Sequence, residues 1–189
     1  VYKRQVYFIS DTHFYHTAII PYCQRPFLSV DDMNEKLIEN WNKVVTNEDT
    51  VYFLGDFGFS SAPKLKDITS RLNGYKIIIR GNHDRDRGEV SWKNIGFDEV
   101  LDGRIEFIYA DKNNELRKIY LSHEPLYINN EDFNIHGHIH DTPLNSEFPD
   151  MNPNNHLCVS VERINYTPIS LKEIKEKYLD SFFESKKGR

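Results

Sequence analysis

The chain has 189 residues, of which 39% are hydrophobic and 13% aromatic, so it is long enough to bury one substantial core. Its formal net charge of −5 is mild, and acidic and basic residues are mixed along the chain. This excludes a global electrostatic field that would recruit nucleic acid or an anionic membrane surface. We expect residues 1–189 to form a single domain, in which any attraction for an anionic substrate is local.

The cysteine content and the hydropathy indicate the cellular setting. Cys23 and Cys158 stand in unrelated contexts without a CxxC spacing, which predicts reduced thiols in a reducing compartment. The sequence shows no basic-then-apolar leader, and no apolar stretch approaches the roughly 18 residues needed to cross a bilayer. We therefore expect a cytoplasmic protein without a membrane segment.

In the first half of the chain, short β-branched and aromatic runs alternate with segments of helical period, a pattern typical of layered α/β architecture. Residues 6–10 predict a buried strand. In residues 30–45, apolar side chains such as Met33, Leu37 and Trp41 recur at helical spacing, so this helix is expected to pack one face on a sheet. The elements that follow are expected to be a strand at 50–54, a helix at 63–73 and a strand at 76–80.

The second half begins with a region, 81–103, that is expected to be largely irregular. An antiparallel hairpin is predicted next, with strands at 104–109 and 116–121. Two further strands, at 134–136 and 158–161, flank an Asn- and Pro-rich stretch at 141–156 that predicts a long surface loop. A final helix is expected at 171–183, with Ser170 and Glu173 forming a capping box at its start.

Polar motifs follow five of these apolar runs. In chain order they are Ser10-Asp11-Thr12-His13, Gly55-Asp56, Gly81-Asn82-His83-Asp84, Ser122-His123 and Gly137-His138-Ile139-His140. A turn aspartate or a packed histidine would explain any one of them alone. Open α/β sheets place functional groups outside the carboxyl ends of their strands, and every motif sits at such an end. We therefore predict one metal site formed by Asp11, His13, Asp56, Asn82, His123, His138 and His140.

The ligand chemistry indicates the metal and the reaction. Oxygen and imidazole ligands without a thiolate favour manganese as the first choice, with iron, zinc or nickel as alternatives. Two divalent ions roughly 3.5–4 Å apart lower the pKa of a bridging water and neutralise phosphoryl oxygens. The expected cofactors are therefore two divalent metal ions, and the expected reaction is attack of a metal-bridging hydroxide on a phosphate ester.

The motifs DxH, GD, GNHD, SH and GHxH, in this order, resemble the calcineurin-like metallophosphoesterase superfamily from about residue 6 to residue 161, and in particular a small, compact bacterial and phage subgroup. The resemblance implies an α/β fold, a four-layer sandwich of two mixed β-sheets flanked by α-helices. It also implies two ligand sets that share a bridging Asp56: Asp11, His13, Asp56 and His140 for one ion, and Asp56, Asn82, His123 and His138 for the other. His83 then becomes the catalytic group that approaches the substrate phosphate, and Asp84 the acid that orients it.

Substrate contacts are expected from Asn82, His16 and Arg80. His16 follows His13 by three positions and could reach over the site, although a packing role in the loop is an equal alternative. Arg80 could hold phosphate oxygens. For His136, which has the same strand parity as His138, a packing role is the preferred interpretation.

The expected substrate is a small phosphate ester. Without a long insertion to build a deep pocket, we predict an open site that hydrolyses small phosphodiesters of nucleotide type. The alternatives are a phosphomonoesterase, a nuclease, which the absence of a basic stripe makes less favoured, and a non-catalytic binding scaffold with the same fold. Such a scaffold is expected to lack part of the ligand set, which this sequence retains, and nothing in the sequence requires an oligomer.

Overall fold

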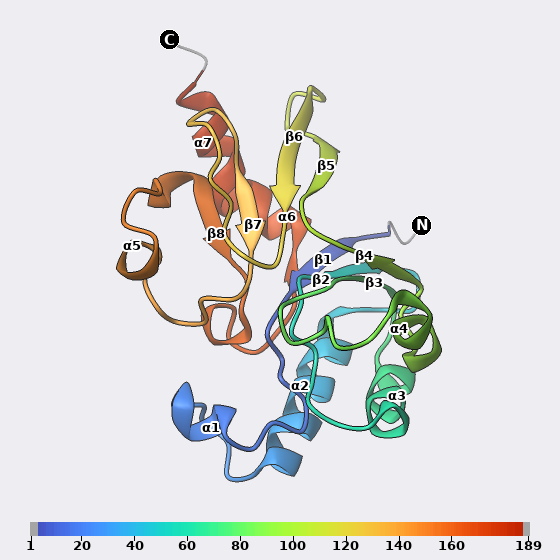
Figure 1. Ribbon diagram of the computed structural model, residues 1–189. Helices are drawn as coiled ribbons and strands as arrows, with labels where there is room; N and C mark the ends of the chain where they lie inside the picture. Colours follow the sequence, from blue (N-terminus) through green and yellow to red (C-terminus); the bar gives the residue numbers. More distant parts are fainter. Residues whose placement is uncertain (1–3, 187–189) are drawn as a thin grey trace.

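The structure is a computed structural model and describes residues 4–186 (Figure 1). These residues form two β-sheets, with the strand orders β4-β3-β2-β1-β9 and β5-β6-β7-β8. The strands are β1 (Val6–Ile9), β2 (Thr50–Phe53), β3 (Tyr75–Ile79), β4 (Glu99–Leu101), β5 (Ile105–Ala110), β6 (Leu116–Leu121), β7 (Asn134–His136), β8 (His156–Cys158) and β9 (Ile169–Ser170). The helices are α1 (Ile19–Tyr22), α2 (Val30–Val44), α3 (Ala62–Arg71), α4 (Glu89–Ile95), α5 (Leu144–Glu147), α6 (Leu171–Ile174) and α7 (Asp180–Glu184), with the 3₁₀ turns η1 (Pro153–Asn155) and η2 (Val161–Arg163) and the π-helical turn η3 (Lys175–Leu179).

Both sheets are mixed. In the first sheet β1, β2, β3 and β4 run parallel, and β9 pairs antiparallel with β1. In the second sheet β5 and β6 form the predicted antiparallel hairpin, while β6, β7 and β8 run parallel. The prediction of an α/β fold with two mixed sheets flanked by helices is therefore confirmed. The parallel register also brings the carboxyl ends of β1, β2 and β3 to the same edge of the first sheet, with Ile9 opposite Phe53.

The first sheet has a core on each of its faces. Ile9 and Phe53 belong to a buried cluster with residues of α2, α3 and α4. Their neighbours Phe8 and Leu54 point to the other face, where they pack with Ile135 of β7 and with residues of α6 and α7. In Figure 1, α2, α3 and α4 accordingly lie on the side of the first sheet that faces away from the second sheet. The sheets thus pack together with helices outside them.

Serine caps begin two of the predicted helices. Ser29 Oγ accepts a hydrogen bond of 3.1 Å from the Asp32 amide at the start of α2. Ser170 Oγ accepts one of the same length from the Glu173 amide, where α6, η3 and α7 together run from residue 171 to 184. Both helices match the predicted ranges to within a residue. None of the helices in residues 4–186 combines the length and the apolar character needed to cross a bilayer.

Three sequence-based expectations were wrong in detail. The region 81–103 contains α4 and β4, which are too short to show a clear period but bury Trp92 and Ile95. The predicted loop at 141–156 contains α5 and η1, and its Leu144 and Met151 pack into a small core with Ile139.

The third error concerns the strand predicted at 158–161. The strand is β8, which ends at Cys158, and the chain then crosses from the second sheet to the first. The amide of Val159 still bonds to His136 of β7, whereas Ser160 already pairs with Ser10 beyond β1. Neither Cys23 nor Cys158 forms a disulfide, and both are buried.

Candidate metal centre

The seven predicted metal ligands converge where strands of the two sheets end. Asp11 and His13 follow β1, Asp56 follows β2 and Asn82 follows β3, while His123 follows β6 and the His138–His140 segment follows β7. Parallel pairing brings three of these ends together in the first sheet and two in the second. The strand-end pattern in the sequence therefore gave the correct spatial cluster.

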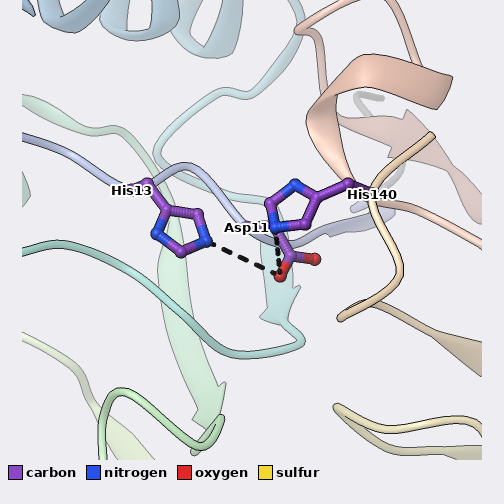
Figure 2. Close-up of side chains that lie close together, drawn as sticks. All are labelled: Asp11, His13 and His140. Atoms are coloured by element: carbon purple, nitrogen blue, oxygen red, sulfur yellow. Dashed lines mark ion pairs between the residues drawn. The ribbon is translucent and has the colours of Figure 1, made fainter. Parts of the chain in front are cut away.

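One group consists of Asp11, His13 and His140, whose ligand atoms all lie within 4.8 Å of one another. Figure 2 shows the rings of His13 and His140 both directed toward the carboxylate of Asp11, although they come from different segments of the chain. Nε2 of His13 and Nε2 of His140 each lie 4.0 Å from Asp11 Oδ1. His13 Nε2 is also 3.8 Å from Asp56 Oδ2, which connects this group to the next one.

The second group consists of Asp56, His123 and His138, again within 4.8 Å of one another. His123 Nδ1 lies 2.7 Å from the carbonyl oxygen of Leu54, so this nitrogen carries the proton in the neutral ring and Nε2 presents a lone pair. The Nε2 atom lies 2.9 Å from Asn82 Oδ1 and 3.5 Å from Asp56 Oδ2. Several acceptors therefore point at one another, an arrangement that a shared cation stabilises.

Two of the candidate ligand atoms provide a test of whether a metal fits. Asp11 Oδ1 and His13 Nε2 are buried and have no hydrogen-bond partner in the described part of the chain. Leaving such a group unsatisfied costs about 1–3 kcal/mol. Metal–ligand bonds of about 2.0–2.2 Å place two ligands of one ion about 3–4 Å apart, which matches the separation of these atoms. The residues present therefore fit divalent ions.

The second oxygen of Asp11 explains why the first is free. Asp11 Oδ2 accepts hydrogen bonds from Ser10 Oγ at 2.6 Å, from Ser160 Oγ at 2.7 Å and from the His138 amide at 2.9 Å. These three donors occupy Oδ2 and fix the carboxylate plane. Oδ1 is thereby directed at His13 and His140.

Five of the seven candidate ligands have left-handed backbone conformations. Their φ angles are 57° at Asp11, 51° at His13, 60° at Asp56, 71° at His138 and 49° at His140. Non-glycine residues adopt this region rarely, and such strain clusters at functional sites. The turns after the strands thus direct the side chains to one point at a cost in backbone energy.

Two glycines are required because carboxylates lie against their backbone. A Cβ at Gly81 would lie 2.2 Å from Asp56 Oδ1, and a Cβ at Gly137 would lie 2.5 Å from Asp11 Oδ2. Each glycine immediately precedes a predicted ligand in the sequence. The GN and GH pairs of the motifs thus have a steric explanation.

Without a bound cation, the electrostatics of the site favour a proton at two histidines, which binding of a metal ion would displace from Nε2. Burial lowers the pKa of His140, but the Cys23 thiol, the Glu162 carboxylate and the charge of Asp11 outweigh it and raise the pKa to about 11. At His123 burial is likewise outweighed, by Asp56 and Asp11, and the pKa rises to about 9. Burial lowers the pKa of His13 to about 2, which keeps that imidazole neutral and available as a ligand.

His83 lies in the same cavity but outside both groups. The cavity has a volume of about 600 Å³ and is lined by ligands and by His83, His16, Tyr22, Asp141 and Glu147, among others. The His83 side chain is exposed there, and its ring lies 5.9 Å from that of His13. Its backbone amide donates to Asp56 Oδ1 at 3.0 Å. His83 therefore lies near the candidate ligands but is not one of them.

Asp84 occupies a different position from the one expected. Its carboxylate is fully buried and accepts hydrogen bonds from the amides of Asp56, Phe57 and Gly81, at 2.6, 3.1 and 2.8 Å. These bonds hold the turn that carries Asp56 rather than the ring of His83. Burial raises the pKa of Asp84 to about 6 despite these donors. The described contacts of the Asp84 carboxylate are thus to the backbone of the Asp56 turn and of Gly81.

Of the three expected substrate contacts, Asn82 and His16 line the cavity. His16 Nδ1 lies 3.4 Å from His13 Nδ1, and its ring packs on Phe59 with a centroid distance of 4.3 Å. Arg80 is engaged elsewhere: its guanidinium donates to both oxygens of Asp102, at 2.8 and 2.6 Å, and to the Arg87 carbonyl at 2.7 Å. The structure does not bring Arg80 together with the other predicted site residues.

Sequence reasoning missed two buried charged residues beside the ligands, Arg25 and Glu162. Glu162 Oε1 lies 3.1 Å from His140 Nδ1 and accepts from Arg25 Nε at 2.8 Å. A signal for Glu162 was present, because it directly follows the apolar run 158–161, as the other ligands follow theirs. Arg25 stands in a Gln-Arg-Pro-Phe segment, which predicts a loop and gives no sign of a functional residue.

His136 was expected to have a packing role. Its side chain is buried, and its Nδ1 lies 2.9 Å from the Gly137 carbonyl oxygen, which is consistent with that role.

The two-sheet fold and the histidine- and carboxylate-rich groups at the strand ends are those of a metallophosphoesterase. The family model for calcineurin-like phosphoesterases matches residues 4–185, and the chain belongs to this family. The chain is 42% identical over 174 residues to the uncharacterized protein MJ1445 of Methanocaldococcus jannaschii, covering 89% of this chain and 88% of that protein. It is also similar to the crystal structure of AQ665, a protein of unknown function from Aquifex aeolicus, with 31% identity and a TM-score of 0.68, covering 92% of this chain and 99% of the other.

Proposed function

We propose that this protein hydrolyses small phosphodiesters of nucleotide type with the help of two divalent metal ions. The observation that carries the proposal is the pair of ligand groups that meet at Asp56 in one cavity, with unpartnered ligand atoms on Asp11 and His13. Divalent ions bound here would lower the pKa of a coordinated water and polarise phosphoryl oxygens. Asp11, His13 and His140 would hold one ion, Asn82, His123 and His138 the other, with Asp56 between them.

The remaining residues of the cavity support specific roles. The exposed imidazole of His83 lies beside the ligands, where it can donate a proton to the departing oxygen of the substrate. Asn82 and His16 border the same space and are proposed to contact the phosphate. Asp84 acts through the backbone of Asp56 and Phe57.

The charge of the cavity lining favours a small substrate with a single phosphate. Of the described residues that line it, none is lysine or arginine, while Asp56, Asp141 and Glu147 are acidic. A polyanionic ligand such as nucleic acid would lack the cationic partners that neutralise successive phosphates. A diester carries one negative charge and a monoester up to two, so the acidic rim favours the diester. Tyr22, which lines the cavity and is 82% exposed, offers a ring on which a nucleobase could stack.

The test is a metal-dependent assay of the full chain. After treatment with a chelator, the protein is reloaded with manganese, and in parallel with iron, zinc or nickel, and presented with an aryl phosphodiester and an aryl phosphomonoester. We expect turnover of the diester that depends on added metal. Turnover of the monoester alone would establish a phosphatase instead, and no metal-dependent turnover of either would contradict the enzymatic proposal. A subsequent panel of cyclic nucleotides, dinucleotides and nucleoside monophosphates identifies the natural substrate class.

A further inference from the structure

We propose that Arg25 and Glu162 are positioning residues of the metal centre, which act through His140 and through the backbone turn that carries Asp11 and His13. The inference rests on the proposed metal binding. Arg25 lies between α1 and α2, and Glu162 lies in η2, so both come from segments outside the two ligand groups described above. Glu162 also forms a third group of possible ligands with Cys23 and His140, but its Oε1 is engaged by Arg25 and by His140 Nδ1. The side chains of Arg25 and Glu162 are 0% and 5% exposed, which makes this a buried ion pair.

The first step is the contact between Glu162 and His140. Glu162 Oε1 lies 3.1 Å from His140 Nδ1, so Nδ1–H of the neutral ring donates to the carboxylate. This places the lone pair on Nε2, the nitrogen that lies 4.0 Å from Asp11 Oδ1. A carboxylate behind a ligating histidine fixes the tautomer and the ring orientation and makes the ligand more basic.

The second step is the contact between Arg25 and Glu162. Arg25 Nε donates to the same oxygen, Oε1, at 2.8 Å, and Arg25 Nη2 lies 2.7 Å from it in an ion pair. These contacts and that of His140 Nδ1 thus converge on one oxygen of Glu162. A buried carboxylate without charged partners is strongly destabilising, and Arg25, together with His140, compensates the buried charge of Glu162.

The third step connects the same guanidinium to the ligand turn. Arg25 Nη2 donates to the Asp11 carbonyl at 2.7 Å, and Nη1 donates to the Thr12 carbonyl at 2.8 Å. Asp11 and His13 have φ angles of 57° and 51° in this turn, and the hydrogen bonds hold it in that conformation. One arginine therefore ties two ligands from β1 to a third ligand from the second sheet.

A purely structural role would predict a different outcome on substitution. If the pair only holds the fold together, its loss lowers stability and leaves the metal affinity of the surviving folded protein unchanged. If it positions ligands, its loss weakens one ion and spares the other, because Asp56, His123 and His138 have no contact with Arg25 or Glu162 in any interaction found within residues 4–186. The two ions provide an internal comparison.

The experiment titrates manganese into the chelator-treated full chain by calorimetry and records the visible spectrum of the cobalt-loaded protein. The variants are Glu162→Gln and Arg25→Lys. The double variant Arg25→Met with Glu162→Met removes both buried charges together and therefore keeps the fold if a single variant does not. The matched control is Arg117→Lys, whose guanidinium pairs with Asp111 at 2.9 Å in the β5–β6 hairpin.

We expect the variants to weaken one ion by about 10- to 100-fold, the range seen when partners of metal ligands are lost, while the second ion changes by less than about 2-fold. The cobalt spectrum should change in Glu162→Gln and stay unchanged in Arg117→Lys. Equal affinities for both ions in the folded variants and the wild type, or an equal loss at both ions, would overturn the positioning role. Failure of the proposed function is distinguishable, because a wild-type chain that binds two ions without hydrolysing any ester contradicts that function and still reports on Arg25 and Glu162.

Discussion

The backbone amide of His138 donates a hydrogen bond of 2.9 Å to Asp11 Oδ2, across a separation of 127 residues in the chain. Asp11 follows β1 of the first sheet and His138 follows β7 of the second. This bond therefore joins the two sheets at the metal centre. Gly137 makes it accessible, because only a residue without a side chain leaves room for the carboxylate.

Gly137→Ala is expected to disturb the metal centre by steric contact. The new Cβ would lie 2.5 Å from both Asp11 Oδ2 and Ser10 Oγ, so either the backbone at residue 137 or these two side chains must move. We expect a loss of about 1–3 kcal/mol in the free energy of unfolding, together with weaker binding of one metal ion. Chemical denaturation and metal titration measure both effects. Gly88→Ala is the control, because nothing lies within 4 Å of a Cβ at Gly88, and an equal effect there would contradict the steric explanation.

His83→Ala is expected to reduce turnover by about 100-fold or more and to leave both metal ions bound, because the lost group is a proton donor and not a ligand. The ring is exposed, so stability should stay within about 0.5 kcal/mol of the wild type. Steady-state kinetics and metal analysis of the same preparation test this. Unchanged turnover would remove His83 from the mechanism.

Asp56→Asn provides the contrasting result. The substitution removes the charge at the point where the two ligand groups meet, 3.8 Å from His13 Nε2 and 3.5 Å from His123 Nε2. We expect weaker binding of both ions and a loss of activity that follows the loss of metal. Full retention of both ions at native affinity, with activity lost, would contradict the shared position assigned to Asp56.

Asp84→Asn tests the reassigned role of that carboxylate. The Asp84 carboxylate now accepts hydrogen bonds from three backbone amides. In the variant, an NH₂ group replaces one of its oxygens, so that two donors face each other. We expect the free energy of unfolding to fall by about 2 kcal/mol or more, since a buried donor then lacks an acceptor. His83→Ala, measured beside it, should show no such loss. If the Asp84 variant were as stable as the wild type and lost only activity, the original interpretation as an orienting acid for His83 would be restored.

Asp49→Asn tests a pH-dependent contribution to stability away from the metal centre. Burial raises the pKa of Asp49, but hydrogen bonds from the amides of Thr46 and Gln5 and from the Thr46 hydroxyl outweigh it and hold the pKa below its usual value. A depressed carboxyl pKa stabilises the fold above the unfolded value of about 3.9, and this contribution is lost as the pH falls through the folded value. The difference in the free energy of unfolding between wild type and variant should therefore be largest at about pH 5–7 and shrink as the pH falls below the unfolded value of about 3.9. A difference that is constant across this range would contradict the linkage.

The clustering of the candidate metal ligands could be predicted from the sequence because their signal is local. Each motif follows an apolar run, and parallel strands such as β1 and β2 carry their ends to the same edge. The partners of the ligands gave no comparable signal. Arg25 and Glu162 are 137 residues apart, and their pairing depends on where the segment between α1 and α2 meets η2 in the folded chain. The contacts of Asp84 could not be predicted for the same reason, since its hydrogen bonds come from backbone amides that have no signature in the sequence.

Short elements were missed because they offer too few residues for a period to emerge. α4 has 7 residues and β4 has 3, and both are defined by packing on β3 and α3 rather than by their own pattern. The final helix, which has a serine cap and a long apolar face, was predicted nearly to the residue. Length and capping thus decided which elements could be predicted.

The left-handed backbone at five ligands has a kinetic consequence. The sheets and the hydrogen bonds around Asp11 already impose these conformations, so the incoming cation meets donors that are arranged before it arrives. If the site binds metal as proposed, we expect uptake to require loss of water from the ion and little rearrangement of these turns. Association rates should accordingly follow the water-exchange rate of each metal, fast for manganese and slow for nickel, whatever their final affinities.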